Sequence, residues 1–386
     1  MHAVIRQKQG IPWTKEQPKG MKANLEHLAS GRVEPNVPVA ADTLQLAYGA
    51  GMAPKLVAEV SSPLLALRQK ALIQVIKAMS APRELASLLV AGLVPALNAA
   101  AAADDDMVRS SANLALAQAA GYPGGQRAML ATSSVDRLVG GASPIVCDAN
   151  EAVRAHALRA VLELGKNPDG CRALIDASAV QLLIARVSAE APLLQGLALM
   201  ALQQLMTQKA GLADSIREGG LGVLIPLLSS EERLAREKAA LALVALTTGL
   251  AEKLAAGPSA LPPLIAMLRD EAPSARHAAS SALMSITVDK DVKEMAVSAG
   301  VGPALGAALD ECVANELQPE EVRDLLVAAL TVNLLQTINQ MAEYPKARSY
   351  FKAKGALQKL MTLEQSSNEH VKKHAAKAVA QVTWMP

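Results

Sequence analysis

The stretch "VRAHALRAVLELG", residues 153–165, decides the fold. Its apolar residues recur at intervals of three and four, the spacing of an amphipathic helix with one buried face. The pattern V-R-x-x-A-x-x-A-L returns with small changes in "VRSSANLAL", "AREKAALAL", "ARHAASSAL" and "VKKHAAKAV". The first alanine of each copy is small enough to let two helices cross closely. These crossing alanines are Ala71, Ala112, Ala157, Ala198, Ala239, Ala279 and Ala375.

A second motif, a small residue followed by x-apolar-x-x-Leu, recurs in register with the first. Examples are "GLVPAL" from residue 92 and "GVGPAL" from residue 300, and most successive copies start 40 to 45 residues apart. Room remains for a third helix in each unit, and three helices in about 41 residues is the period of armadillo repeats. The final leucines form a predicted ladder: Leu56, Leu97, Leu138, Leu183, Leu224, Leu264, Leu305 and Leu360.

These copies predict an all-α fold for residues 51–386: a right-handed superhelical armadillo solenoid of about eight repeats. One unit cannot bury its apolar face alone, so the copies must stack around a continuous core. Hydrophobic residues make up 51% of the chain and aromatics 2%, which suits closely packed helices of alanine and leucine. Residues 1–50, rich in Pro, Gly and Lys, predict an extended basic N-terminal arm. Trp13 in this arm is either an anchor for a partner groove or a cap over the first repeat.

Two repeats are irregular. Repeat three gains four residues around "GGASPIVCDANEA", which is either neutral drift in a loop or part of a binding surface. Repeat seven gains six residues around "DECVANELQPEEV" and eight around "TINQMAEYPKARSYF", and places Leu326 in the slot of the crossing alanine. We expect the insertions of repeat seven to bind a partner, because the repeat holds aromatics beside basic residues and aromatics are enriched at interfaces. The residues concerned are Tyr344, Arg348, Tyr350 and Phe351.

Charge and composition argue against several classes of function. The net charge of +2 divides into about +3 for residues 1–40, +6 for residues 346–386 and −7 between them. A nucleic-acid-binding protein usually concentrates positive charge along its main surface, so we expect the charged ends to dock on acidic protein surfaces instead. No apolar run approaches the roughly 20 residues that span a membrane, and the N-terminus lacks a secretory signal. Three widely spaced cysteines favour a reducing, intracellular compartment.

The candidate chemical residues all have an ordinary structural explanation. His156 and His277 lie next to crossing alanines, in slots that other copies fill with lysine, serine or alanine. His370 and His374 have the i, i+4 spacing of metal ligands, but no third ligand accompanies them. "GYPGGQ" (121–126) lacks the GK[ST] of a phosphate-binding loop. The sequence therefore predicts no catalytic residue, metal site, cofactor or small-molecule substrate, and hence no enzyme.

The inner helix of each repeat is where armadillo proteins that bind extended peptides carry an asparagine ladder with tryptophans. Six residues after the crossing alanines this chain has no such ladder, which disfavours that mode of binding. A mixed polar groove could still hold a different partner. Its predicted contacts are Gln118, Glu163 and Gln204.

The chain resembles armadillo-repeat proteins of the radial spoke of motile cilia, in the radial spoke head protein 14 homologue family. The resemblance rests on "AYGAGMAPKL", "RQKALIQVIKAM", "SSALMSITV" and the ending "VTWMP", while the basic arm before residue 40 departs from it. It implies a non-enzymatic scaffolding subunit of the axonemal radial spoke that holds other spoke proteins together and supports motility, located in the cytoskeleton of the cilium. The alternative is a soluble adaptor that binds peptide or cargo in its concave groove.

Overall fold

The computed structural model describes residues 49–353 and 355–384 of the chain. The described residues form 22 α-helices and three short 3-10 helices, with no strand among them. The prediction of an all-α, solenoid-like repeat fold is therefore confirmed. Trp13 and nearly all of the predicted N-terminal arm lie outside the described residues.

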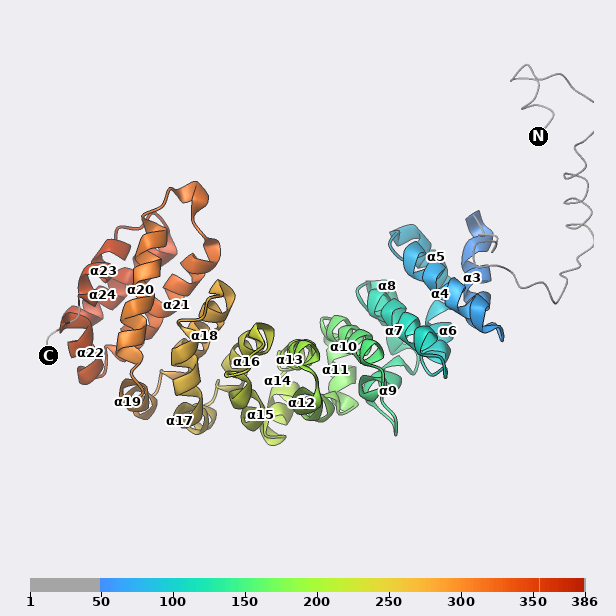
Figure 1. Cartoon of the computed structure of the whole chain (residues 1–386), viewed down its shortest axis with the longest axis horizontal. Coiled ribbons are helices and arrows are strands. Elements are labelled where there is room, and N and C mark those ends of the chain that lie inside the picture. The colour runs from blue at the N-terminus through green and yellow to red at the C-terminus, as the bar shows by residue number, and fades with distance from the viewer. Residues whose placement is uncertain (1–48, 354, 385–386) are drawn as a thin grey trace, which may run out of the picture. The chain divides into compact units, whose positions relative to one another are not determined.

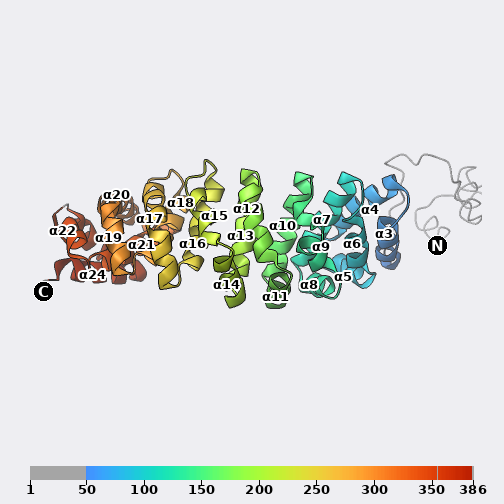
Figure 2. The same ribbon diagram turned by 90° about the horizontal axis from the view of Figure 1, so that it is seen from below.

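Eight long helices, seven of which carry the crossing alanines, follow one another along the described chain. Each of them contacts the next in chain order, and Figures 1 and 2 show them stacked side by side. They are α4 (Leu65–Ala78), α7 (Asp106–Ala120), α10 (Glu151–Gly165), α13 (Pro192–Leu205), α16 (Arg233–Leu246), α18 (Pro273–Ile286), α21 (Leu325–Met341) and α24 (Glu369–Thr383).

Local signals explain where these helices begin. Side chains of Asp105, Asn150 and Asn368 accept hydrogen bonds from the first free backbone N–H groups of α7, α10 and α24. Proline occupies the first turn of α13 and α18, where its missing N–H costs nothing.

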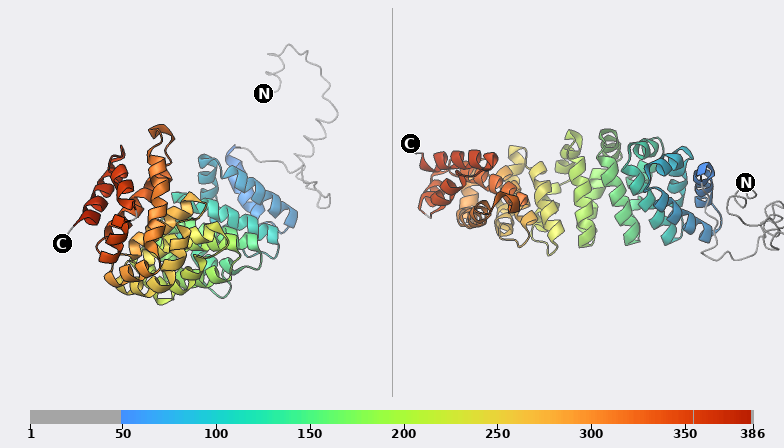
Figure 3. Two further views of the ribbon diagram at one scale, coloured as in Figure 1. Left: turned by 60° about the vertical axis from the view of Figure 1, so that its left-hand side comes forward. Right: turned by 90° about the horizontal axis from the view of Figure 1, so that it is seen from above.

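The remaining helices connect and cover this series. They are α3 (Met52–Val60), α5 (Pro82–Val90), α6 (Leu93–Ala100), α8 (Pro123–Leu130), α9 (Ser134–Val139), α11 (Pro168–Asp176), α12 (Ala179–Ala189), α14 (Lys209–Arg217), α15 (Gly220–Leu227), α17 (Leu250–Met267), α19 (Lys290–Ser298), α20 (Val301–Glu316), α22 (Pro345–Ala353) and α23 (Ala356–Leu363), with η2 (Gly49–Gly51), η3 (Ile145–Cys147) and η4 (Glu320–Val322). Figure 3 shows from two more directions how they accompany the long helices.

The connecting helices depart once from the expected pattern. Between α5 and α6, and between α14 and α15, a glycine with positive φ (Gly92, Gly219) ends one helix and starts the next. The equivalent position in the sixth unit is Ser259, and there α17 continues without a break. The expected pair of helices is a single helix here, and no residue of it adopts the left-handed conformation that Gly92 and Gly219 adopt between the other pairs.

The core is continuous along the described chain. All eight ladder leucines and all seven crossing alanines are buried, and they belong to one hydrophobic cluster. The expected slot of Leu326 is wrong, because Leu326 is partly exposed and Thr331 is the buried residue at the position equivalent to Ala279. Its hydroxyl donates to the Val327 carbonyl at 2.7 Å, which satisfies its polar atom within the helix.

The extra residues of the seventh unit lie mainly between α20 and α21. There α20 runs on to Glu316 and η4 follows before α21 starts. The segment "TINQMAEYPKARSYF", expected to be a second insertion, instead forms the end of α21 and most of α22.

Among the described helices, none is by itself long and apolar enough to cross a membrane; only α5 and α6 together, bent by 80°, reach the required length and composition.

Candidate protein-binding groove

A groove of about 470 Å³ opens on the face formed by α10, α13 and α16. Two of the three residues predicted to line a polar groove, Glu163 and Gln204, meet there. The full lining is Arg159, Leu162, Glu163, Lys166, Leu197, Met200, Gln203, Gln204, Thr207 and Lys238.

Helical spacing brings these side chains to one face. The lining residues of α10 and the loop after it, from Arg159 to Lys166, recur at intervals of three and four, as do those from Leu197 to Thr207 on α13 and just beyond it. The opposite face of each helix carries the crossing alanine and its buried neighbours. Burial of one face thus fixes which side chains face the groove.

The groove combines aliphatic side chains with polar ones, among which basic residues outnumber the acidic Glu163. Leu162, Leu197 and Met200 supply apolar surface. Lys166 Nζ donates to Glu163 Oε1 at 2.6 Å, while the Gln204 amide donates to the Gly165 carbonyl at 3.3 Å and ties α13 to α10. Such a surface fits an extended segment that presents both aliphatic and polar groups.

Gln118 does not join this groove. It lies on α7, and its amide oxygen is buried without a hydrogen-bond partner in the described part of the chain. Sequence position alone could not show that Glu163 lines the groove and Gln118 does not, because both have the same register and the groove depends on how the next long helix packs.

The aromatic residues of α22 serve mainly inside the fold. Phe351 is fully buried, so its predicted role as a partner contact is wrong; it occupies the apolar face of α22. Tyr350 meets Phe351 edge to face at 5.6 Å and packs against the glycines of α20. Tyr344 is also partly buried against the core. Arg348 donates to the Ala342 carbonyl at 2.7 Å and lies 4.8 Å over the exposed ring of Trp384.

An unpredicted polar chain links successive units, here named the arginine chain and comprising Arg109, Arg154, Arg236 and Arg276. Each arginine lies three residues before a crossing alanine and donates to two carbonyls of the loop before its own helix. Each also pairs with an acidic residue of the next unit. The repeated arginine of the V-R-x-x-A motif is the sequence signal that could have revealed it.

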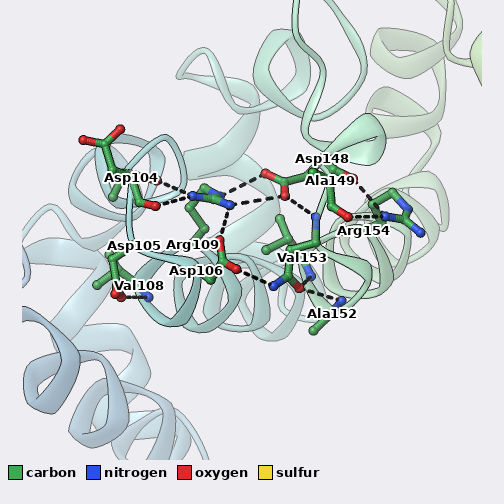
Figure 4. A network of polar contacts seen from close by, with 12 residues as sticks. Asp104, Asp105, Asp106, Val108, Arg109, Asp148, Ala149, Ala152, Val153 and Arg154 are labelled. Atoms are coloured by element: carbon green, nitrogen blue, oxygen red, sulfur yellow. Dashed lines mark hydrogen bonds and ion pairs between the residues drawn. The ribbon is translucent and has the colours of Figure 1, made fainter.

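Asp148 shows how the links continue (Figure 4). Its carboxylate accepts from Arg109 Nε at 3.0 Å, and its carbonyl accepts from Arg154 Nη1 at 2.9 Å. Asp270 repeats the arrangement between Arg236 and Arg276. Burial disfavours the Asp270 carboxylate, but hydrogen bonds from the Ala272 amide and Arg236 outweigh it and lower its pKa.

The titratable groups elsewhere do not assemble into a metal site. Among the described residues no group of three or more His, Cys, Asp or Glu side chains is placed to hold an ion. Burial, with Arg159 nearby, lowers the pKa of His156, and burial lowers that of His277. Burial raises the pKa of Cys312 to about 12, so this thiol stays protonated at neutral pH.

No protein family and no curated protein matches the sequence. Solved structures do resemble the fold. One engineered protein of the Northeast Structural Genomics Consortium aligns over 87% of this chain and 79% of its own, with a TM-score of 0.73 and 20% identity. A second aligns over 65% of this chain and 97% of its own, with a TM-score of 0.55 and 19% identity. At these identities the likeness is one of fold.

Proposed function

We propose that the chain is a non-enzymatic armadillo scaffold of about eight repeats that holds other proteins together. The observation that carries the proposal is the unbroken series of long helices, each packed on the next, with a groove of mixed polarity on their exposed face. A solenoid of this kind offers an extended surface to protein partners.

The cellular setting we propose is the axonemal radial spoke of a cilium or flagellum, with other spoke proteins as partners. Its support is the sequence resemblance carried by "AYGAGMAPKL", "RQKALIQVIKAM" and "VTWMP". The test is to fractionate salt- and chaotrope-extracted axonemes that contain the tagged full chain. We expect the chain to sediment with the spoke complex; sedimentation with free cytosolic proteins refutes this setting.

The second candidate function is that of an adaptor that binds a peptide in the groove. The aliphatic side chains of the groove and its excess of basic over acidic residues favour it. Replacing Glu163 and Gln204 with alanine should then weaken peptide capture by the full chain. Gln118→Ala is the matched control, because Gln118 has the same sequence register but lies outside the groove. Equal losses in both variants would contradict a peptide site in the groove.

A further inference from the structure

The loop that joins α20 to α21 exposes an unusual amount of apolar surface. Leu317, Val322 and Leu325 are 71%, 66% and 83% exposed. They are three of the fourteen large hydrophobic side chains that are exposed in the described part of the chain, and they fall within nine residues. We name residues 315–325 the acidic tip; Figure 1 shows it as the orange loop at one end of α20.

Two side-chain hydrogen bonds connect the ends of the acidic tip, although it lies outside the repeat. The Asp324 amide donates to Asn315 Oδ1 at 3.0 Å, and Asn315 Nδ2 donates to the Asp324 carbonyl at 3.3 Å. These two bonds join the end of α20 to the start of α21. Apolar groups on a fixed loop lose little conformational entropy when a partner covers them, which favours binding.

Arg323 braces the same loop from inside. It donates to Glu316 at 2.7 Å, to the Gln318 carbonyl at 2.9 Å and to Ser367 Oγ at 2.8 Å. Ser366 in turn donates to Glu316 at 2.6 Å, which attaches the tip to the loop before α24. The Arg323–Glu316 ion pair is partly shielded from solvent and fixes the loop against the start of α24.

The charge left on the outside of the tip is negative. Arg323 is the only basic residue between Arg276 and Lys346, except for Lys290 and Lys293 on α19, and its charge is taken up by Glu316. Glu320 and Glu321 are exposed, whereas Glu369, at the start of α24, is exposed but pairs with Lys372. The tip therefore presents aliphatic side chains among carboxylates.

We propose that the acidic tip is a docking site for a protein segment that combines aliphatic side chains with lysine or arginine. The aliphatic groups of the partner would cover Leu317, Val322 and Leu325, and its cations would pair with Glu320 and Glu321. The inference rests on the proposed scaffolding function but uses a surface separate from the groove. Failure at the tip would leave sedimentation with the spoke complex unchanged, so the two proposals fail independently.

The test measures binding of a fluorescent amphipathic leucine–lysine peptide to the full chain by anisotropy. Serine replacement of all three apolar residues of the tip should weaken binding about tenfold or more. The matched control replaces three exposed apolar residues elsewhere, namely Val90, Leu193 and Leu250. Thermal unfolding of both variants checks that the fold is unchanged. Equal weakening by the tip and control variants would overturn the proposal.

Charge and location are tested in the same assay. Glu320→Gln with Glu321→Gln should weaken binding and reduce its salt dependence, whereas Glu231→Gln with Glu232→Gln on another loop should not. A photo-crosslinking residue at position 322 should capture the peptide. Crosslinking to residues 1–48 of the same chain, or equal affinity for a leucine–glutamate peptide, would refute a basic partner.

Discussion

At the scale of single residues, Glu190 is expected to stabilise the fold strongly, although it lies in the loop between α12 and α13. Its carboxylate is fully buried and accepts from Arg154 Nε at 2.9 Å and from Arg186. It thereby joins α10 to the end of α12. A buried carboxylate between two arginines is costly to disturb, because removal of the anion leaves both cations without their partner.

Glu190→Ala should lower the free energy of unfolding by about 3 kcal/mol, as expected for a buried ion pair that loses one member. Urea titration followed by circular dichroism measures the change. Glu218→Ala is the control, since Glu218 pairs with the mostly exposed Arg217 and water screens such surface pairs. A loss at Glu190 no larger than that at Glu218 would show that the arginine chain does not stabilise the fold.

His156 and His277 predict a pH dependence of stability. Their pKa values are lowered in the folded chain, chiefly by burial, so the unfolded chain binds protons more readily. Stability should be full above about pH 6.5 and fall as the pH drops below it, towards the lower folded pKa values. The double variant His156→Asn, His277→Asn should lose less free energy of unfolding between about pH 7 and 5.5. An unchanged pH profile, compared with the exposed His370→Asn control, would contradict this.

At the scale of elements, the apolar periodicity of the sequence predicts which helices form and which of their faces is buried, but not where helices break or how insertions shift the register. The long helices, their crossing alanines and the leucine ladder follow from apolar spacing, because only that spacing buries one face. The break expected before Ser259 does not occur, which shows that the motif alone does not impose a helix break. Leu326 satisfied the local pattern, yet the inserted residues shift the register of α21 and bury Thr331 instead. The sequence likewise could not show that Phe351 is buried rather than on the surface, because its burial depends on the other helices that pack against α22.

Gly170 is the element-scale test of close packing. A Cβ there would lie 2.2 Å from the Leu164 carbonyl oxygen, so α11 could not follow α10 as closely. Gly170→Ala should lower the free energy of unfolding by about 1–3 kcal/mol through overpacking. Gly222→Ala is the control: nothing lies within 4 Å of its Cβ position in α15, and the change should stabilise by up to about 1 kcal/mol. Thermal melting of both variants measures these changes. Equal melting temperatures would show that α11 can move away from α10 at no cost, so that the added methyl group causes no overpacking.

At the scale of the whole described unit, each long helix is stabilised by packing on the long helices before and after it, and not by packing around one central core. Each long helix contacts the next, and the arginine chain adds an ion pair between neighbouring units at four of these steps, so disturbance is expected to spread by adjacency. The groove and the acidic tip depend on different neighbours: the first needs α10, α13 and α16, the second needs α20, α21 and the loop before α24. The register of the repeat correctly placed Glu163 and Gln204 in the groove but also suggested Gln118, which lies outside it, because the groove depends on which long helices pack together. The tip lies where the period fails, and the sequence marked it only as an insertion.

Leu224→Ala tests this coupling directly. Leu224 is fully buried in α15, and its truncation should cost about 2–5 kcal/mol by leaving a cavity. Hydrogen exchange read by mass spectrometry should accelerate in α15 and its contacts α12, α14, α16 and α17, while α3 and α24 keep their protection. Leu360→Ala is the mirror control, because α23 contacts α20, α22 and α24 instead. The two variants should therefore deprotect different regions; uniform acceleration along the chain in both would show that the described helices unfold as one all-or-none unit.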